Sequence, residues 1–372
     1  MKSTLTRVPF SSAAFSPIFR LQNRLRFTLS SSTAVAVSLS NPKSVSVQTP
    51  LFLRPPSHSA TLGGICRWYH WAKTLSASVG STFSAFDGGP DCSHLLRELK
   101  WLAEDAIEDA SPVIHQMQLS CTPRDQWRLL KLRTPLEELY ALWKQRIEER
   151  RPFQYIVGCE HWGDLVLSVQ EGVLIPRPET ELIVDLVGEV VSGNEGLSEG
   201  LWADIGSGSG AIAIGIGRVL GAQGRVIATD LSPVAVAVGS FNVQRYGLQE
   251  KIKVRHGSWF EPLKDVEGKL VGLVSNPPYI PSADIHGLQA EVGKHEPRLA
   301  LDGGVNGMDG LIHLSNQAAL MLRPGGFFSF ETNGEEQSSF LVNHMGNESR
   351  FHHVKALADF AGIQRFVTGF CC

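Results

Sequence analysis

The chain has 372 residues, with 34 Lys and Arg against 37 Asp and Glu, and its net charge of −3 hides a strong asymmetry. Nine of the basic residues precede Asp87, the first acidic residue, so the rest of the chain carries 25 basic against 37 acidic residues and a net charge of about −12. An acidic body argues against broad binding of a nucleic-acid backbone and favours a basic protein partner. No run reaches the roughly 20 apolar residues of a membrane-spanning helix, so we expect no membrane insertion.

The first 86 residues are rich in Ser and Thr, contain Arg and contain no acidic residue. This composition is typical of an organellar transit peptide, and the serine content favours a plastid over a mitochondrion. A disordered tail without a targeting function is the alternative. We expect residues 1–86 to be a transit peptide or disordered, with cleavage between about Ala60 and Phe86. The six cysteines show no metal-ligand spacing, which indicates reduced thiols in an intracellular compartment.

The periodicity of apolar residues changes twice along the rest of the chain. Helical spacing from Ser93 to about Arg150 predicts a small helical domain over residues 87–150. Alternation with turn-forming glycines predicts a hairpin linker over residues 151–174. Strands and helices then alternate as in a parallel doubly wound sheet, which predicts a second domain over residues 175–372. Its predicted strands are 201–205, 225–229, 252–255, 270–275, 326–331 and an antiparallel hairpin within 354–370.

A glycine-rich turn, Asp204-Ile205-Gly206-Ser207-Gly208-Ser209-Gly210, follows the first strand of this domain. Glycines allow a tight turn and a close approach of the backbone to a ligand. The spacing is G-x-G-x-G, which makes a dinucleotide-binding loop of the G-x-G-x-x-G type the less favoured alternative. Asp230 lies 20 residues beyond Gly210, at the end of the next strand. A carboxylate in that position can accept hydrogen bonds from ribose hydroxyls.

A second motif, Asn276-Pro277-Pro278-Tyr279, follows an apolar strand that its two prolines terminate. Ligands of open α/β sheets bind at this carboxyl edge of the strands. A side-chain amide beside an aromatic ring suits a flat nitrogen group, which is the target of an amino-methyltransferase. The alternative is a proline-terminated turn with an exposed Asn.

Taken together, these motifs resemble the HemK family of protein-(glutamine-N5) methyltransferases, which modify peptide-chain release factors. The resemblance extends from about Gln154 to the C-terminus. Besides the two motifs above, it rests on Gln154-Tyr155-Ile156-Val157-Gly158, on Leu174-Ile175-Pro176-Arg177-Pro178-Glu179-Thr180-Glu181 and on Glu296-Pro297. One departure is Glu331-Thr332-Asn333-Gly334, where the family usually has one residue fewer between Glu and Gly.

The resemblance implies an α/β class I methyltransferase fold: a doubly wound, mostly parallel seven-stranded sheet preceded by a small N-terminal helical domain and a β-hairpin linker. It implies S-adenosylmethionine as the cofactor and no metal. The implied cofactor-binding residues are Thr180, Gly206, Ser207, Gly208, Ser209, Gly210, Asp230, Trp259 and Asn276. The implied substrate-binding residues are Asn276, Pro277, Pro278 and Tyr279, of which Asn276, Pro277 and Tyr279 are expected to be catalytic.

The expected reaction is methylation of the side-chain nitrogen of the glutamine in the Gly-Gly-Gln motif of an organellar class I release factor. The expected partner is that release factor, with no stable nucleic-acid binding, no membrane and a monomeric state. Alternatives are an N-methyltransferase of adenine or guanine in RNA or DNA, a glutamine methyltransferase of a ribosomal protein, and a non-catalytic binding protein. The acidic body argues against the nucleic-acid alternatives, since it offers no basic binding surface.

Overall fold

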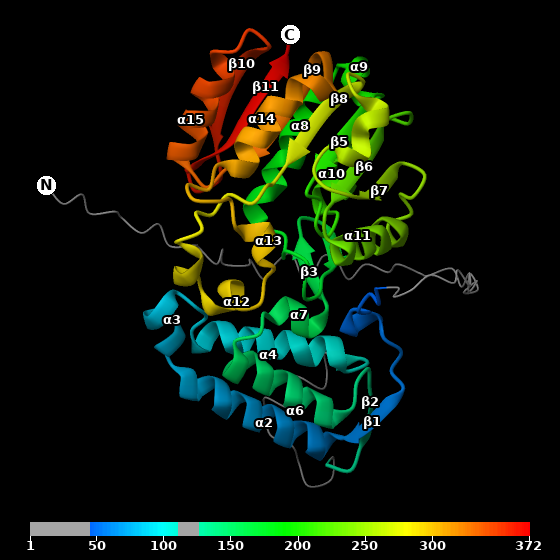
Figure 1. Ribbon diagram of the computed structural model, residues 1–372. Coiled ribbons are helices and arrows are strands. Elements are labelled where there is room, and N and C mark those ends of the chain that lie inside the picture. Colours follow the sequence, from blue (N-terminus) through cyan, green and yellow to red (C-terminus); the bar gives the residue numbers. More distant parts are fainter. Residues whose placement is uncertain (1–44, 111–125) are drawn as a thin grey trace, which may run out of the picture.

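The computed structural model describes residues 45–110 and 126–372. Figure 1 shows a helical domain at the bottom of the view and a sheet domain at the top, with a linker and the short helices α12 and α13 between them.

The helical domain packs around the long helix α2, because apolar residues recur along one side of it at helical spacing. Trp68 of α2 and Trp143 of α6 are fully buried, and the Trp143 indole donates a hydrogen bond to the Ala72 carbonyl at 3.1 Å. The elements of this domain are η1 (Leu51–Leu53), β1 (His58–Thr61), α2 (Leu62–Val79), α3 (Thr82–Asp87), α4 (Cys92–Ala106), β2 (Leu129–Leu132), α6 (Leu136–Lys144) and η2 (Gln145–Glu149). Strands β1 and β2 pair antiparallel.

This domain begins before the predicted boundary at residue 87. Helix α2 is capped by Thr61, whose hydroxyl accepts a hydrogen bond from the Gly64 N–H, and its apolar side is part of the buried core. Residues 45–86 therefore belong to the folded part, contrary to the prediction, and cleavage between Ala60 and Phe86 would remove part of this core. Residues 1–44 lie outside the described residues. From residue 45 on, the chain has 28 basic against 37 acidic residues, a net charge of −9 in place of −12.

The linker contains a hairpin, as predicted, but also a helix. Strands β3 (Cys159–Trp162) and β4 (Leu165–Ser168) pair antiparallel around Gly163. They are preceded by the single-turn helix α7 (Phe153–Val157), which ends at Gly158 with a left-handed φ of 76°. The prediction of a strand at residues 152–158 was therefore wrong. Neighbouring elements cover the short helix on most sides, which buries Phe153, Tyr155, Ile156 and Val157.

The sheet domain has seven strands in the order β10-β11-β9-β8-β5-β6-β7. Six of them run in one direction, and β11 runs antiparallel between β9 and β10. The predicted doubly wound, mostly parallel seven-stranded sheet is confirmed, as is the closing antiparallel hairpin. The strands are β5 (Leu201–Ile205), β6 (Arg225–Asp230), β7 (Ile252–His256), β8 (Leu270–Ser275), β9 (Leu322–Glu331), β10 (Phe351–Ala358) and β11 (Gln364–Cys371).

Helices cover both faces of this sheet, so its central strands are apolar on both sides. Along β5, Trp202 packs into the core under α8 and α10, while the next residue, Ala203, packs into the core under α14 and α15. The covering elements are η3 (Pro178–Thr180), α8 (Glu181–Val191), α9 (Glu195–Ser198), α10 (Ala211–Val219), α11 (Pro233–Arg245), η4 (Glu261–Val266), α14 (Asp309–Met321) and α15 (Glu335–Gly346).

A long loop, residues 276–308, connects β8 to α14 and reaches the helical domain (Figure 1). It contains η5 (Ile285–Gly287), α12 (Ala290–Gly293) and α13 (Arg298–Leu301). Glu291 of α12 accepts hydrogen bonds from Arg146 Nη1 at 2.9 Å and Arg150 Nε at 2.6 Å. The Ala290 N–H donates to the Asp87 carboxylate at 2.9 Å. These contacts fix the loop to the helical domain.

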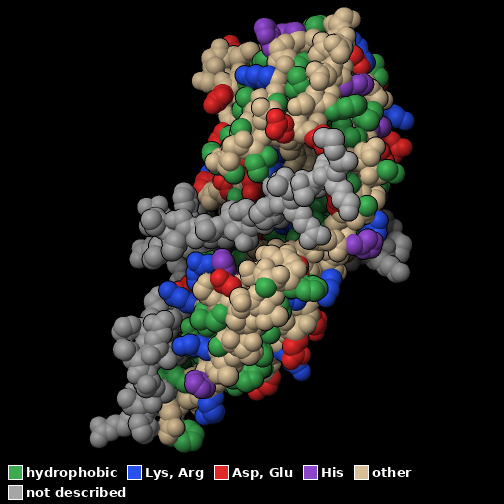
Figure 2. Space-filling view, turned by 90° about the vertical axis from the view of Figure 1, so that its left-hand side faces the viewer, with side chains coloured by type: hydrophobic (Ala, Val, Ile, Leu, Met, Phe, Trp, Pro, Cys, Tyr) green, Lys and Arg blue, Asp and Glu red, His purple; other side chains and the backbone are tan. Residues whose placement is uncertain are grey.

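The described surface carries both signs of charge. Figure 2 shows Lys and Arg side chains interspersed with Asp and Glu on the helical domain and on the sheet domain. Within residues 45–110 and 126–372, no helix has the length and apolar character needed to cross a bilayer.

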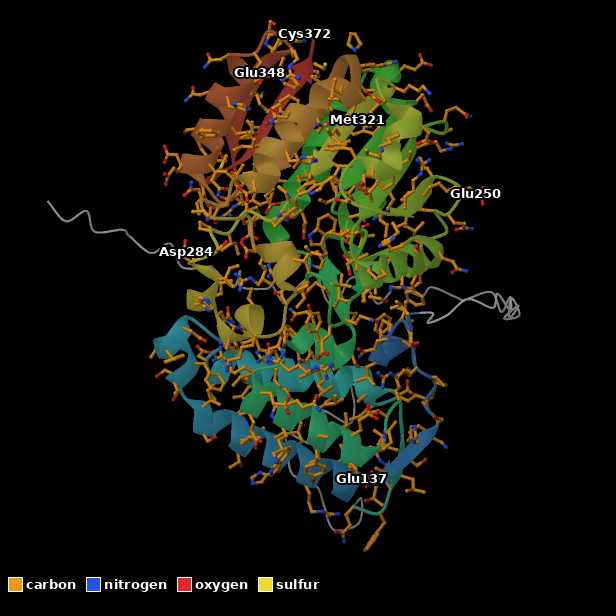
Figure 3. The ribbon with its side chains drawn as sticks, in the orientation of Figure 1. Glu137, Glu250, Asp284, Met321, Glu348 and Cys372 are labelled. Atoms are coloured by element: carbon orange, nitrogen blue, oxygen red, sulfur yellow. The ribbon has the colours of Figure 1, made fainter. Side chains whose placement is uncertain are left out.

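No disulfide joins the cysteines within the described ranges, and Cys121 lies outside the described residues. Figure 3 places Cys372 at the end of the sheet domain that is remote from Glu137 of the helical domain.

Candidate functional site

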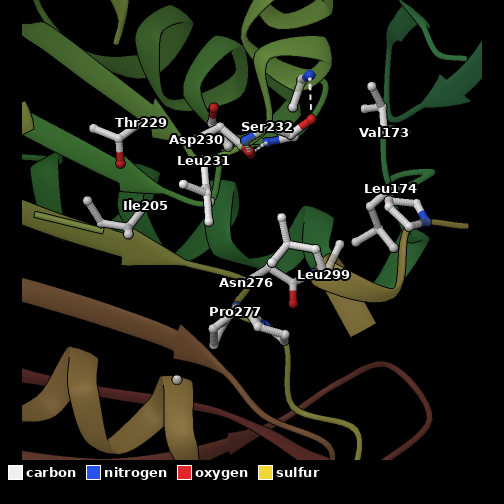
Figure 4. Close-up of a pocket in the computed structure, with 18 of the residues that line it drawn as sticks. Val173, Leu174, Ile205, Thr229, Asp230, Leu231, Ser232, Asn276, Pro277 and Leu299 are labelled. Atoms are coloured by element: carbon white, nitrogen blue, oxygen red, sulfur yellow. Dashed lines mark hydrogen bonds between the residues drawn. The ribbon is translucent and has the colours of Figure 1, made fainter. Parts of the chain in front are cut away.

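A cavity of about 600 Å³ opens at the carboxyl ends of β5, β6 and β8. Figure 4 shows its lining, with Ile205 and Thr229 on the left, Val173 and Leu174 on the right, and Asn276 beside Leu299 below the centre. The linker, the glycine loop, the proline motif and the long loop all contribute to the wall. The cavity lies where parallel sheets bind ligands, because the strand-to-helix turns diverge there.

The glycine loop forms one side of the cavity. Gly206, Gly208 and Gly210 have φ values of 73°, 54° and 81°, which L side chains rarely adopt. The backbone N–H groups of Gly206 and Ser207 both donate to the Thr229 carbonyl at 2.9 Å, so the loop is tied to the end of β6. Of the five predicted loop residues, Gly206, Ser207, Gly208 and Ser209 line the cavity. Gly210 does not line it and instead begins α10 as its N-cap residue.

Asp230 lies across from this loop at the last position of β6. Its Oδ2 accepts a hydrogen bond from the Gly208 N–H at 2.8 Å, and its Oδ1 accepts one from the Ser232 N–H at 2.8 Å, drawn as a dashed line in Figure 4. Burial raises the pKa of Asp230, while these hydrogen bonds lower it. The carboxylate is thus fixed at the cavity wall with lone pairs available for a ligand's hydroxyl groups.

Asp204, for which sequence analysis gave no role, lies beneath the glycine loop. Its side chain is fully buried, and its Oδ2 accepts a hydrogen bond from the Ala213 N–H at 3.0 Å. Asp204 Oδ1 and Ser207 Oγ have no hydrogen-bond partner among the described residues. Burial raises the pKa of Asp204 to about 7. Of these two residues, Ser207 lines the cavity, so its unpaired hydroxyl can bind a polar ligand group.

Trp259 forms a flat wall of the cavity. It has a left-handed φ of 47°, and its ring lies 5.0 Å from the His313 ring, measured between centroids. Both residues line the cavity. Burial lowers the pKa of the His313 imidazole. An aromatic face of this kind suits a planar heterocycle.

The proline motif forms the cavity wall opposite the glycine loop. Asn276, Pro277 and Pro278 line the cavity, whereas Tyr279 does not. The Tyr279 hydroxyl instead donates a hydrogen bond to Glu331 Oε1 at 3.1 Å, and burial raises the pKa of this tyrosine. The structure thus brings three of the four predicted substrate-contacting residues to the cavity.

Thr180 connects the proline-rich stretch that follows the linker to this motif. Its side chain lines the cavity, and its hydroxyl donates to Glu331 Oε2 at 2.7 Å. The Asn276 amide donates in turn to Thr180 Oγ1 at 3.2 Å. Glu331 is 1% exposed, and burial raises its pKa to about 7. In the sequence, Glu331 stands out only through the extra residue that follows it. A glutamate at the end of an apolar strand is nevertheless a signal that could have assigned it to the site.

The same stretch is held against the long loop. Glu296 accepts hydrogen bonds from Arg177 Nη2 at 2.5 Å and from the Ile175 N–H at 3.1 Å. Trp162 of β3 donates through its indole N–H to the Arg177 carbonyl at 2.7 Å. These contacts explain why residues far apart in the sequence form one wall.

The departure after Glu331 is accommodated locally. The additional residue, Asn333, donates its backbone N–H to Gln337 Oε1 at 2.9 Å, and Gln337 donates to the Tyr279 carbonyl at 2.9 Å. The position of Glu331 in the site is therefore preserved. Within the described ranges, no group of three or more His, Cys, Asp or Glu side chains is placed to hold a metal ion.

Comparison with known proteins identifies the family of this chain. Residues 178–276 match the family model "Ribosomal protein L11 methyltransferase (PrmA)". A methyltransferase structure from Pyrococcus furiosus matches with a TM-score of 0.41 and 17% identity, covering 56% of this chain and 89% of that chain. The release factor glutamine methyltransferase of Gloeobacter violaceus is 44% identical over 232 residues, covering 62% of this chain and 78% of that protein. That of Thermosynechococcus vestitus is 36% identical over 301 residues, covering 81% of this chain and 96% of that protein. Since the match extends over nearly the whole of this relative, the chain belongs to the release factor glutamine methyltransferase family, as the resemblance to HemK proteins predicted.

Proposed function

We propose that this protein methylates the side-chain amide nitrogen of the glutamine in the Gly-Gly-Gln motif of a class I peptide-chain release factor, with S-adenosylmethionine as methyl donor. The observation that carries the proposal is one cavity lined both by a glycine loop with Asp230 and by Asn276-Pro277-Pro278. A donor site and an acceptor site for the methyl group are thereby adjacent. Membership of the family supports the same assignment of substrate and reaction.

The donor side of the cavity fits S-adenosylmethionine in chemistry. Asp230 would accept hydrogen bonds from the ribose hydroxyls, and Trp259 would flank the adenine. The unpaired Ser207 Oγ offers a polar partner to the charged methionine end, and Thr180 would line that end. When bound, S-adenosylmethionine supplies a methyl group that is attached to a sulfonium centre. The neutral sulfide that this centre becomes is a good leaving group, so the transfer needs no metal assistance.

The acceptor side would orient the substrate amide. An amide nitrogen is a poor nucleophile, because its lone pair is delocalised into the carbonyl. The Asn276 side-chain oxygen and the Pro277 backbone carbonyl would accept the two N–H bonds of the substrate. This holds the nitrogen in line with the methyl group and favours rehybridisation, which is catalysis by orientation and fixed dipoles. Tyr279 would act on the substrate through its hydrogen bond to Glu331. Because Tyr279 does not line the cavity, its ring would pack on the substrate only where the substrate extends beyond the cavity.

The proposal can be tested by incubating the protein with labelled S-adenosylmethionine and one candidate acceptor at a time. We expect label in a release factor with Gly-Gly-Gln and none in its Gly-Gly-Glu variant, which lacks the acceptor nitrogen. Peptide mass spectrometry should place one added methyl group on the glutamine. Label found only in ribosomal RNA, in DNA or in a ribosomal protein would overturn the substrate assignment, and the match to the L11 methyltransferase model makes the ribosomal protein a necessary arm.

We propose further that the protein acts in an organelle, more specifically the plastid, as a monomer that binds neither membranes nor nucleic acids stably. The acid-free, Ser-rich segment at residues 1–44 and the cyanobacterial origin of two relatives support the plastid. Since α2 belongs to the fold, residues 1–50 fused to a fluorescent reporter are the fitting test. We expect plastid fluorescence, and a cytosolic signal would contradict the targeting proposal.

A further inference from the structure

Four side chains form one hydrogen-bonded chain at the acceptor side of the cavity: Thr180 and Glu331 are buried, and Asn276 and Tyr279 are partly buried. The Thr180 hydroxyl lies at its centre, 2.7 Å from Glu331 Oε2 and 3.2 Å from Asn276 Nδ2. Tyr279 occupies the other carboxylate oxygen of Glu331 at 3.1 Å. Thr180 is 3% and Glu331 is 1% exposed, so solvent does not compete for the hydrogen bond between them.

The protons in this chain can be assigned from the chemistry of its members. An ionised carboxylate only accepts hydrogen bonds, so Thr180 and Tyr279 must both donate to Glu331. A threonine hydroxyl has one proton, and once it is donated the oxygen presents only lone pairs. Asn276 must therefore turn its NH2 group toward Thr180, which directs its carbonyl oxygen away from Thr180.

We propose that Glu331 and Thr180 are positioning residues that set the orientation of the Asn276 amide, with its oxygen presented to the substrate nitrogen. The inference rests on the proposed role of Asn276 in methyl transfer. If the amide were reversed, its NH2 group would face the NH2 group of the substrate glutamine and no hydrogen bond could form. Glu331 thus acts on the substrate through two intervening side chains and does not touch it.

Protonation of Glu331 would reverse the chain. A neutral carboxyl can donate to Thr180, whose hydroxyl is then free to donate to Asn276 and favours the reversed amide. The charged and titratable groups that face Glu331 are Arg365 of β11, which lowers its pKa, Glu179 of η3, which raises it, and Tyr279. Arg177 in turn faces Tyr279. Because burial outweighs these contributions and raises the pKa of Glu331 to about 7, kcat should be full above pH 7 and should fall as the pH drops through that value.

The first test compares two replacements of Thr180 in the release factor assay. Thr180→Val keeps the shape but removes the hydroxyl, and we expect kcat to fall about tenfold, since one substrate hydrogen bond is no longer oriented. The KM for the release factor should change less than kcat. Thr180→Ser restores the hydroxyl and should recover most of the lost kcat. Equal kcat in the valine and serine variants would overturn the proposal.

The second test uses the pH dependence of kcat between pH 6 and 9, and it stands even if the valine variant fails to fold. Glu331→Gln does not titrate between pH 6 and 9, so the acid-side loss of kcat should disappear whichever way the new amide turns. Glu336→Gln, which neutralises an exposed glutamate on α15, should keep the wild-type profile and serves as the matched control. An unchanged acid limb in Glu331→Gln would overturn the proposal.

The two proposals fail in different ways. If the wild-type protein leaves the release factor unlabelled, the proposed function is wrong. If the wild type labels it and Asn276→Ala does not, but both tests above give wild-type behaviour, only the positioning role of Glu331 and Thr180 is wrong.

Discussion

Replacing Asn276 with alanine is expected to lower kcat for glutamine methylation by about 10²- to 10³-fold, the usual effect of removing a preorganised partner of the reacting group. The side chain lines the cavity at the carboxyl end of β8, where its oxygen can accept a substrate N–H. The Kd for S-adenosylmethionine should change by less than about threefold, since the glycine loop and Asp230 remain intact. Single-turnover methylation and equilibrium titration of the cofactor measure the two quantities separately.

Asp230→Ala is the matched comparison, because it removes a carboxylate from the donor side of the same cavity. We expect it to raise the Kd for S-adenosylmethionine far more than Asn276→Ala does. Normal methylation by Asn276→Ala would show that Asn276 has no part in the reaction. A large loss of cofactor affinity in that variant would move Asn276 from the acceptor side to the donor side.

Replacing Glu291 with alanine is expected to reduce the free energy of unfolding by about 3 kcal/mol, because it leaves two buried guanidinium groups short of a partner. Arg146 is 2% and Arg150 is 6% exposed, and both bond to Glu291. Their remaining partners, Glu98 and Asp87, keep the loss at the low end of the range for broken buried pairs. Urea unfolding at pH 7 measures the change through the midpoint and slope of the transition.

The loss should depend on pH. Burial alone would raise the pKa of Glu291, but the hydrogen bonds and charges of Arg150 and Arg146 hold it below its usual value. A lowered pKa stabilises the folded state above the unfolded-state pKa of about 4.5, and that contribution is lost as the pH falls through the lower folded value. Glu250→Ala, at the exposed position labelled in Figure 3, should change stability by less than about 0.5 kcal/mol. An equally small effect of Glu291→Ala would mean that the loop is not held by this cluster.

Much of the sheet domain could be predicted from the sequence, because its local patterns agree with its tertiary structure. The strands that contain residues 201–205 and 270–275 are short apolar runs buried on both faces, and Ser232 with Pro233 begins α11 as cap and first residue. The start of the helical domain could not be found in this way. Helix α2 has no acidic residue, so its composition matched that of the preceding segment, and only its buried packing against α4 and α6 distinguishes it.

The candidate site was predictable only where a short motif contains the relevant residues. The glycine loop, Asp230 and the first three residues of the proline motif line one cavity. The contact between Thr180 and Glu331 joins residues 151 positions apart, and no local pattern specifies such a pairing. Tyr279 was expected at the cavity because it follows Pro278, but the turn directs its hydroxyl to Glu331 instead.

Among its contacts, the long loop after β8 reaches the cavity at Asn276 and, fifteen residues later, the helical domain at Glu291. We therefore expect a displacement of the helical domain to be felt, through this loop, at the acceptor side of the cavity. Any partner that prefers one position of that domain acquires a coupling free energy with the cavity, and such coupling is reciprocal. Each domain has its own core, and through this loop we expect cofactor occupancy and partner affinity to be linked.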